Sequence, residues 1–470
     1  MWSERDTIFA LSSGRPPAAI AVVRVSGPRA RDAMVALGGR VAQPRQATLL
    51  RLKRRSQGGG GPAADSPVEP IDDAVVLWFP GPRSETGDDT VEFHLHGGHA
   101  VVAAVLAALG ELEGLRPAGP GEFTRRAFAN GKLDLTRVEG LADLIGAETE
   151  AQRRQAFRQL KGLLGDRADT WRQRLTQALA MVEAVIDFAE EDVISDKLIR
   201  PALAIAKDLD REIGGLLAGS HRGERLREGL TVAVAGPVNV GKSSIVNRLA
   251  KRSAAIVSPY AGTTRDVIEV HLDLGGYPVT VLDTAGMRDT RDPVEEEGVR
   301  RAQVRAQAAD LVLWVIDASL GDRLPPPSEL ARPGAAPLWL LSNKSDLAER
   351  ERLERPLAAA AETSAGLTCY RISALTGESF DELVEGLAEF ARRFFSEGGE
   401  SGLVTRQRHR ALLGECADAL ARACSEGESG REDIIAEELR LAAHALGRLV
   451  GRVDVENILD VIFRDFCIGK

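Results

Sequence analysis

Cysteines are few in this chain, and none of them is spaced for a metal or disulfide motif. Four of the 470 residues are cysteines, at positions 369, 416, 424 and 467, and no two form a Cys-x-x-Cys pair. A zinc knuckle or a disulfide-stapled secreted scaffold needs closely spaced cysteines. The sequence therefore argues against both and suits a reducing, cytoplasmic environment.

The chain also lacks long hydrophobic runs and an excess of positive charge. No apolar stretch approaches the roughly 20 residues that cross a bilayer, and the first residues do not resemble a signal peptide. We therefore expect a soluble, cytoplasmic protein without a membrane partner. The net charge of −9 and the pI of about 5.5 give no overall attraction to nucleic acid. Any RNA contact must come from local patches.

A phosphate-binding motif is the clearest feature that is present. The segment Gly-Pro-Val-Asn-Val-Gly-Lys-Ser at 236–243 follows the strand-like apolar run 231–235. Its glycines let backbone amides turn toward a phosphate, and the helix expected to begin near Lys242 directs its positive end at the anion. Lys242 would contact the β- and γ-phosphates and Ser243 a magnesium ion. The segment predicts a P-loop nucleotide hydrolase.

Three further motifs follow in the order of a guanine-nucleotide switch. Thr263 and Thr264 supply hydroxyls for magnesium and the γ-phosphate, and Asp-Thr-Ala-Gly at 283–286 places a carboxylate near the metal and an amide near that phosphate. In Asn-Lys-Ser-Asp at 343–346, the Asp346 carboxylate can accept from both N–H groups of guanine, which adenine lacks. The motifs predict nucleotide contacts at Asn239, Val240, Gly241, Lys242, Ser243, Ser244, Thr263, Thr264, Asp283, Thr284, Ala285, Gly286, Asn343, Lys344, Asp346, Ser373 and Ala374.

The residue after the Asp-Thr-Ala-Gly motif departs from signalling GTPases. Those switches place there a glutamine that orients the attacking water, whereas this chain has Met287. A thioether cannot orient water, so catalysis needs other groups. The candidates are Asn239, whose amide oxygen could hold a monovalent cation beside the phosphates, and the glutamates at 295–297. An asparagine in a turn and a glutamate run on a solvated helix face are the structural alternatives.

The hydrophobic pattern divides the chain into four segments. An α+β pattern covers 1–130, and a helical pattern with three- and four-residue spacing covers 131–228. The GTPase motifs occupy 229–395, and a second helical pattern covers 396–470. Helical stretches on both sides of an inserted domain most simply form one discontinuous bundle. The fold class is therefore multidomain α/β and α, with a Ras-like P-loop domain inserted in a helical bundle.

Motifs outside the GTPase segment resemble a known family. They are Asp-Thr-Ile at 6–8, Val-Arg-Val-Ser-Gly at 23–27, Pro-Gly-Glu-Phe-Thr at 120–124, Lys-Leu-Asp-Leu at 132–135 and Phe-Cys-Ile-Gly-Lys at 466–470. Together with the P-loop they resemble the MnmE (TrmE) family of tRNA modification GTPases over essentially the whole chain. The resemblance implies an enzyme that hydrolyses GTP and, with the flavoprotein MnmG, adds a carboxymethylaminomethyl-type group to C5 of the wobble uridine of certain tRNAs.

The same resemblance implies cofactors, partners and site residues. A 5-formyl- or 5,10-methylene-tetrahydrofolate would be the one-carbon donor, bound by Arg24, Glu92, Lys132 and Lys470 of the α+β domain and C-terminal tail. Potassium would be held by Asn239, Ser258, Tyr260 and Thr263, and magnesium by Ser243 and Thr264; Ser258 also counts among the nucleotide contacts. Glu295 would help to orient water, and Cys467 is either catalytic or merely packed. A homodimer, joined by MnmG into a heterotetramer, is expected.

Two clusters and one rival function stay open. His94, His96 and His99 could bind a metal, although the resemblance favours a structural role. The basic residues Arg406, Arg408, His409 and Arg410 suit tRNA phosphates or a solvated helix start. The rival function is a regulatory GTPase switch in ribosome assembly or stress response. It would explain the P-loop but not the folate-type residues or the Cys467 tail.

Overall fold

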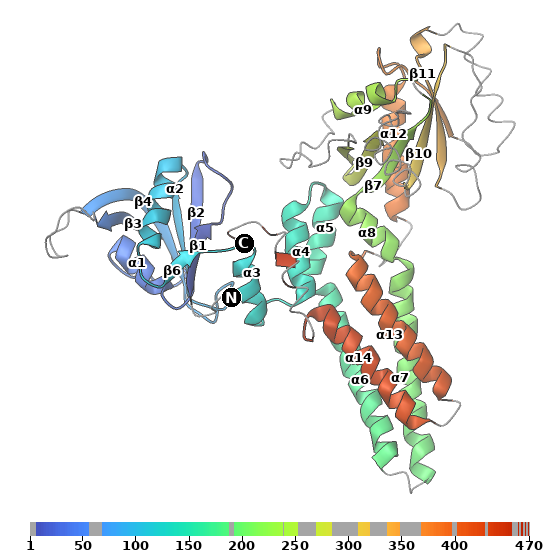
Figure 1. Cartoon of the computed structure of the whole chain (residues 1–470), viewed down its shortest axis with the longest axis horizontal. Coiled ribbons are helices and arrows are strands. Elements are labelled where there is room, and N and C mark those ends of the chain that lie inside the picture. Colours follow the sequence, from blue (N-terminus) through green and yellow to red (C-terminus); the bar gives the residue numbers. More distant parts are fainter. Residues whose placement is uncertain are drawn as a thin grey trace, which may run out of the picture. The chain divides into compact units, whose positions relative to one another are not determined.

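The computed structural model describes residues 6–55, 68–187, 192–237, 239–251, 269–283, 309–319, 336–347, 368–396, 402–427, 431–453, 459, 462, 463, 466 and 469. The chain forms two compact units (Figure 1). The first comprises Met1–Ala142, Gly165–Asp169 and Leu446–Lys470, and the second comprises Asp143–Leu164 and Thr170–Ala445. Among the residues listed above, no helix has both the length and the apolarity to cross a membrane.

The first unit contains a six-stranded sheet in the order β3-β4-β5-β2-β1-β6. All neighbouring strands are antiparallel except β1 and β6, which are parallel. The elements are β1 Thr7–Leu11, β2 Ile20–Ser26, α1 Ala30–Gly38, β3 Thr48–Arg55, β4 Val68–Phe79, β5 Thr90–His96, α2 His99–Gly110, β6 Leu115–Pro117, α3 Glu122–Ala129 and α4 Leu135–Gly146. The mixture of strands and helices agrees with the α+β pattern predicted for this part of the chain.

Strand alternation gives this sheet one buried and one polar face. Val23, Val25 and Phe93 are fully buried and pack with Met34 of α1 and Leu109 of α2 in one core cluster. Successive side chains on a strand point to opposite faces. The opposite face of β2 and β5 therefore carries the intervening residues, which are polar over much of their length.

The end of the chain returns to the first unit. Phe463 and Phe466 pack in a cluster with Leu135 and Val138 of α4. Gly469 has a φ of 99°, and a Cβ there would lie 2.0 Å from the carbonyl oxygen of Leu11 in β1. The close approach therefore requires glycine, and it fixes the tail against the end of β1.

Helices account for one part of the second unit. They are α5 Glu150–Leu160, most of α6 Leu163–Asp187, α7 Asp192–Ala218, α8 Ser220–Glu228, α13 Gln407–Glu426 and most of α14 Glu432–Val450. Long stretches of α7 and α13 run side by side (Figure 1). Segments before and after the GTPase motifs thus pack together, as the periodicity predicted.

The rest of the second unit is a mainly parallel sheet in the order β12-β11-β10-β7-β9-β8, in which β8 alone is antiparallel to its neighbour. Its elements are β7 Leu230–Ala235, α9 Lys242–Ala250, β8 Glu269–Leu274, β9 Tyr277–Asp283, β10 Leu311–Asp317, β11 Leu338–Asn343, the 3₁₀ turn η1 Ser345–Leu347, β12 Thr368–Arg371 and α12 Phe380–Ser396. Buried strand residues such as Val232 and Leu313 pack in one core cluster with Ile245 of α9 and Leu383 of α12. Ligands of open parallel sheets bind beyond the carboxyl ends of the strands, where the predicted motifs lie.

Candidate functional site

The phosphate loop joins the end of β7 to the start of α9. Gly241 is the N-cap of α9 with a φ of 95°, and Gly236 and Asn239 have φ values of 144° and 61°. A Cβ on Gly236 would lie 2.3 Å from the Val315 carbonyl oxygen, and one on Gly241 would lie 2.3 Å from the Asn343 amide nitrogen. Side chains are excluded at both glycines, so the loop backbone can turn its amides toward an anion at the helix start.

Lys242 lies in the first turn of α9 and is buried. Its ammonium donates to the carbonyl oxygens of Gly236 and Pro237 at 2.8 and 2.7 Å. Burial lowers the pKa of Lys242 below its usual 10.5, and the negative charge of Asp283 opposes that shift. Asp283, at the end of β9, is itself 4% exposed. The loop thus holds a desolvated cation whose charged form an added phosphate would favour.

Asn343 connects the phosphate loop to residues 373–377, which follow β12 and are here called the base loop because their Ser373 bonds to Asp346. Asn343 is 2% exposed, and its amide nitrogen donates to the Val240 carbonyl at 2.8 Å. Its amide oxygen accepts from the backbone N–H of Ala374 at 3.0 Å. Lys344, with a φ of 65°, donates to the Asn239 carbonyl at 2.8 Å and pairs with Asp317 at 2.6 Å. These bonds tie the ends of β10 and β11 to the phosphate loop.

Asp346 remains accessible within this arrangement. It follows β11 in the 3₁₀ turn and is exposed. One carboxylate oxygen accepts from the Ser373 hydroxyl at 2.5 Å, which leaves further acceptor positions for a ligand. Ser373 is fully buried and also accepts from the backbone N–H of Thr376 at 3.1 Å. The predicted base-recognition residues therefore lie together, with the carboxylate oriented by a buried hydroxyl.

Arg248 is a site residue that the sequence motifs did not indicate. It lies in α9, and its guanidinium donates to the carbonyl oxygens of Ala374, Leu375 and Thr376 at 2.9, 2.9 and 3.0 Å. A Cβ on Gly377 would lie 1.9 Å from the guanidinium, so glycine is needed there. Arg248 thus fixes the base loop to the phosphate-binding helix. The sequence carries no signal for this role, because the partners of Arg248 are backbone carbonyls.

Several predicted site residues lie outside the described part of the chain. They are Ser258, Tyr260, Thr263, Thr264, Thr284, Ala285, Gly286, Glu295, Cys467 and Lys470, together with Met287. Asn239, Val240, Ser243 and Ser244 are described, in or directly after the phosphate loop; Asn239 and Ser244 are exposed, Val240 is buried and Ser243 is half-buried. Their contacts with nucleotide or metal remain predictions.

Arg24 and Glu92 form a cross-strand pair on the polar face of the first unit's sheet. They are directly opposite each other on β2 and β5. Nε and Nη2 of Arg24 donate to Oε1 of Glu92 at 3.0 and 2.8 Å, and Nη1 pairs with Glu85 at 2.7 Å. Lys132 is exposed and donates to the carbonyl of Pro82. The loop 80–89 therefore contacts Arg24 and Lys132, two of the three predicted folate-binding cations.

The neighbouring histidines have carboxylate partners. Nε2 of His94 lies 3.4 Å from Glu92, and Nδ1 of His96 lies 2.7 Å from Asp72. Among the described residues, no group of three or more His, Cys, Asp and Glu side chains is arranged to hold a metal ion. His94 and His96 thus contact the side chains of the sheet itself.

Two arginines of the basic cluster at the start of α13 form ion pairs within the second unit. Arg406 pairs with Asp143 at 2.6 Å, and Arg410 pairs with Glu224 at 3.3 Å. His409 is fully buried. Arg406 and Arg410 therefore have carboxylate partners within the second unit, and contact of the cluster with tRNA phosphates stays a prediction. Their carboxylate partners are far away in the sequence, so spacing alone could not reveal them.

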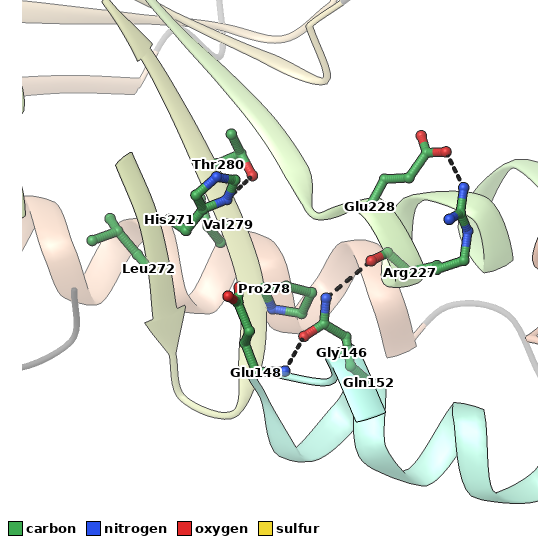
Figure 2. A pocket seen from close by; sticks show the side chains of 10 residues that line it. All are labelled: Gly146, Glu148, Gln152, Arg227, Glu228, His271, Leu272, Pro278, Val279 and Thr280. Carbon is green, nitrogen blue, oxygen red and sulfur yellow. Dashed lines mark hydrogen bonds and ion pairs between the residues drawn. The ribbon is translucent and has the colours of Figure 1, made fainter. Parts of the chain in front are cut away.

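A cavity of about 220 Å³ lies where the β8–β9 hairpin meets α5 and α8 (Figure 2). Gln152 spans the helices there: its amide nitrogen donates to the Arg227 carbonyl at 3.0 Å, and its amide oxygen accepts from the Glu148 N–H at 3.1 Å. The cavity is lined by the first half of β9, including Pro278 and Thr280. It is therefore at the opposite end of that strand from Asp283.

The carboxyl ends of β7, β9, β11 and β12 lie at one edge of the parallel sheet. The phosphate loop, Asp283, the Asn343–Asp346 segment and Ser373 lie at or directly after these strand ends, in the order required for guanine-nucleotide binding. The fold and these loops define a P-loop guanine-nucleotide-binding protein.

Comparisons with known proteins cover the whole chain. The model of the MnmE helical domain matches residues 135–467, and that of the GTP-binding protein TrmE N-terminus matches 7–132. The tRNA modification GTPase MnmE of Rhodopseudomonas palustris (strain BisB18) is 56% identical, with 100% of both chains covered. The protein of that name from Bradyrhizobium sp. (strain ORS 278) is 55% identical, with 99% of both covered.

A solved structure of Aquifex aeolicus Era bound to GDP and aluminium fluoride is 28% identical, covers 40% of this chain and 66% of its own, and has a TM-score of 0.29. The assignment rests on the full-length relatives instead. The chain belongs to the MnmE family of tRNA modification GTPases. The resemblance stated from the sequence and the prediction of a GTP-hydrolysing enzyme are thereby confirmed.

Proposed function

We propose that this chain binds GTP with Mg²⁺ at the carboxyl edge of its parallel sheet and hydrolyses it during the modification of tRNA. The observation that carries the proposal is Asn343, which joins the phosphate loop to the base loop while Asp346 stays exposed beside it. This supports a single site in which the helix start would bind the phosphates and the Asp346 carboxylate would select guanine. Competition between GTP and ATP for the purified chain tests it, and equal affinities would contradict it.

The described residues fit magnesium and triphosphate. Ser243 follows Lys242 in the first turn of α9 and is half-buried, and Asp283 lies close enough to Lys242 to affect its pKa. A hydroxyl and a carboxylate are ligands that Mg²⁺ accepts, directly or through water. When bound, the ion neutralises charge that develops on the phosphates. Lys242 would exchange its two loop carbonyls for phosphate oxygens, and Thr264 would complete the metal site.

Potassium is the proposed substitute for an arginine finger. Asn239 is exposed in the phosphate loop at a φ of 61°, and oxygens of Ser258, Tyr260 and Thr263 would complete the cation site. A cation there supplies positive charge next to the transferring phosphate, and Glu295 would orient water in place of a glutamine. GTP hydrolysis should be faster in potassium than in sodium chloride, and Asn239→Ala should abolish the difference. Equal rates in the two salts would exclude the mechanism without affecting the nucleotide assignment.

A tetrahydrofolate derivative is the proposed ligand of the first unit. Arg24 and Glu92 form a charged pair on its polar sheet face, and the loop 80–89 contacts both Arg24 and Lys132. Gly469 packs on Leu11, whose cross-strand neighbour Val23 precedes Arg24. A carboxylate can accept from a pterin's amino-amide edge, and cations suit the glutamate tail, including Lys470.

The one-carbon group would be added, with the flavoprotein MnmG, to C5 of the wobble uridine of tRNA. A homodimer, a heterotetramer with MnmG and a cytoplasmic location complete the proposal. The alternative is a regulatory switch without RNA chemistry. Nucleoside analysis of tRNA from a deletion strain separates them, because only the enzyme requires loss of the modification. Complementation with a chain lacking 466–470 then tests the tail that contains Cys467.

A further inference from the structure

The outer side of α5 is basic and carries an exposed aromatic ring. Gln155, Ala156 and Gln159 are buried on its inner side. Arg153, Arg154, Phe157, Arg158 and Lys161 are exposed; these five residues are here named the α5 face. At 100° per residue they fall within an arc of about 140°. Four cations and one phenyl ring therefore share one side of the helix.

Phe157 is unusual among the apolar side chains of the chain. It is 44% exposed, and in the described ranges it is the only aromatic among the exposed large hydrophobic residues. The Lys161 ammonium lies 5.3 Å from the centre of its ring. Aromatic residues make up only 4% of the chain. Because the Phe157 ring is exposed, the protein does not gain the favourable free energy of burying it. A ligand that stacks on the ring would provide that free energy.

Two of the four cations of the α5 face are held in place by the carboxylate of Glu150. Glu150 accepts from Arg153 at 2.7 and 2.9 Å and from Arg154 at 2.8 Å. These hydrogen bonds, first from Arg153 and then from Arg154, lower the pKa of Glu150 to about 2. In the described part of the chain neither Arg158 nor Lys161 is paired with a carboxylate. The face keeps a net positive charge although the whole chain has −9.

We propose that the α5 face binds RNA, with its arginines and Lys161 on phosphates and an unpaired base stacked on Phe157. The inference rests on the proposed function, because the RNA is the tRNA that the enzyme modifies. Single-stranded RNA is recognised by aromatic side chains that stack on bases, flanked by cations that contact the backbone. A protein partner or an anionic membrane would use the same charge, but neither requires a ring that stacks.

The position of α5 connects this face to the nucleotide site. The N–H of Ala151, in its first turn, donates to the carbonyl of Gly276 at 3.0 Å. Gly276 lies in the turn between β8 and β9, and β9 ends at Asp283. RNA on the α5 face would thus be bound by the helix against which this hairpin packs. The Figure 2 cavity is at the same junction.

Binding of substrate tRNA to the full-length chain, measured by fluorescence anisotropy over a range of salt concentrations, tests the inference. Phe157→Ala should weaken binding by about 5- to 100-fold, the range for one stacked base, whereas Phe157→Trp should retain it and Phe157→Leu should not. Arg158→Ala should reduce the slope of log affinity against log salt by about 0.7 to 0.9, the value for one phosphate contact.

The second arginine pair of the chain supplies a matched control. Arg392 and Arg393 in α12 both donate to Glu389, at 2.7 Å for each bond, and the pKa of Glu389 is likewise about 2. Phe390 beside them packs against the core of the parallel sheet. Arg393→Ala is therefore the control for Arg154→Ala, because both remove an arginine paired with a glutamate four residues before it. Arg154→Ala should weaken tRNA binding, and Arg393→Ala should not change it.

Three outcomes decide the matter. Loss of tRNA affinity in the Phe157 and Arg158 variants, with GTP affinity retained as the folding check, supports the inference. Unchanged tRNA affinity in both variants overturns it, and retained GTP hydrolysis and tRNA modification would then leave the proposed function standing. Normal tRNA affinity with lost binding of the flavoprotein or of anionic vesicles assigns the face to that partner and also overturns it.

Discussion

The two sheets of this chain have six strands each but place their polar residues in different ways. In the parallel sheet of the second unit, the central strands are almost entirely buried, as in β10, and most of the polar site residues lie at the strand ends or in the loops that follow them. In the first unit's mostly antiparallel sheet, Arg24 and Glu92 lie within the strands, on the face opposite the core. A sheet covered on both faces has only its edges for binding, whereas a sheet with one polar face can bind along it.

This difference predicts where substitutions act. A loop residue at the carboxyl edge of the parallel sheet can change ligand binding without changing the core. A charged residue on the polar sheet face of the first unit should affect both ligand binding and stability, because its partners lie on neighbouring strands and helices. Substitutions in the loops of the second unit should therefore change ligand affinity alone, whereas substitutions in the first unit should change ligand affinity and stability together.

The largest expected effect is on base selectivity through Asp346. Asp346→Asn replaces a carboxylate that accepts two N–H groups of guanine with an amide that presents one acceptor and one donor. GTP affinity should fall by roughly 10³-fold or more, since a site that leaves polar groups unpaired discriminates strongly. Because Asp346 is exposed, the melting temperature should stay the same. Titration with GTP and xanthosine triphosphate checks this, and the variant should prefer the xanthine base.

A lower melting temperature for Asp346→Asn, together with unchanged GTP affinity, would contradict the proposed difference between the two sheets. It would mean that the loop supports the fold and does not read the base. Asn343 is a suitable contrast, because it is 2% exposed and bonded on both sides. Asn343→Ala should lower both affinity and stability.

The second prediction concerns Glu122 in α3, which is 6% exposed. It accepts from Arg116 at 2.9 and 2.7 Å and pairs with the buried Arg126 at 3.3 Å. Glu122→Gln should lower the free energy of unfolding by about 3 kcal/mol, because it removes the nearer of the two carboxylates paired with the buried Arg126 and leaves only Asp88, at 3.5 Å. GTP affinity should be unchanged. Thermal unfolding of the full chain measures the loss, and an unchanged transition would show that the pair is not needed.

The pH dependence of stability tests the Glu122–Arg126 pair a second time. Burial raises the pKa of Glu122, but hydrogen bonds from Arg116 and the Gly119 N–H, with the charges of Arg116 and Arg126, outweigh it and hold the pKa below its usual 4.5. A carboxylate with a depressed pKa in the folded state stabilises it above the unfolded-state pKa, and the stabilisation is lost as the pH falls through the folded-state value. The stability difference between wild type and Glu122→Gln should therefore shrink below about pH 4.

The same contrast explains which parts the sequence could predict. The position of the nucleotide loops was predictable, because sharp turns at strand ends need residues such as Gly236 and Gly241, and because guanine needs an acid like Asp346. Arg248 was not, since its partners are backbone carbonyls that leave no trace in the sequence. The ion pairs of Arg406 and Arg410 were not predictable either, because Asp143 and Glu224 are brought to them only by folding.

Arg248 provides the third prediction, on the connection between two loops of the carboxyl edge. Arg248→Ala removes three hydrogen bonds to the base loop and should weaken GTP binding by about 10- to 50-fold, on the scale of hydrogen bonds made by a charged group. Arg248→Lys keeps the charge but cannot reach three carbonyls with a planar fork, so it should recover only part of the affinity. Stopped-flow measurements should show the loss mainly as faster GTP dissociation. Full recovery by lysine would mean that charge, not geometry, holds the loop.

The smallest expected effect is that of a cross-strand pair in the first unit. Arg24–Glu92 and Arg51–Asp73 are both directly opposite on antiparallel strands. The side chains of the first pair are 16% exposed and those of the second 64% and 51%. Such pairs contribute about 0.2 to 1 kcal/mol, so double-mutant cycles on unfolding should give small coupling energies, larger for Arg24–Glu92.

Folate affinity then separates the two pairs. Arg24→Ala should weaken binding of 5-formyltetrahydrofolate by about 10- to 100-fold, equivalent to the 1.5–3 kcal/mol of a hydrogen bond to a charged group, while Arg51→Ala should not change it. Neither substitution should change GTP affinity, which calorimetry on the same samples measures. Equal folate affinity in the Arg24→Ala variant and the wild type would leave that pair as a strand contact like its exposed counterpart. The polar face of this sheet would then not be a folate site. The two sheets would differ only in strand order and direction, and not in where they bind ligands.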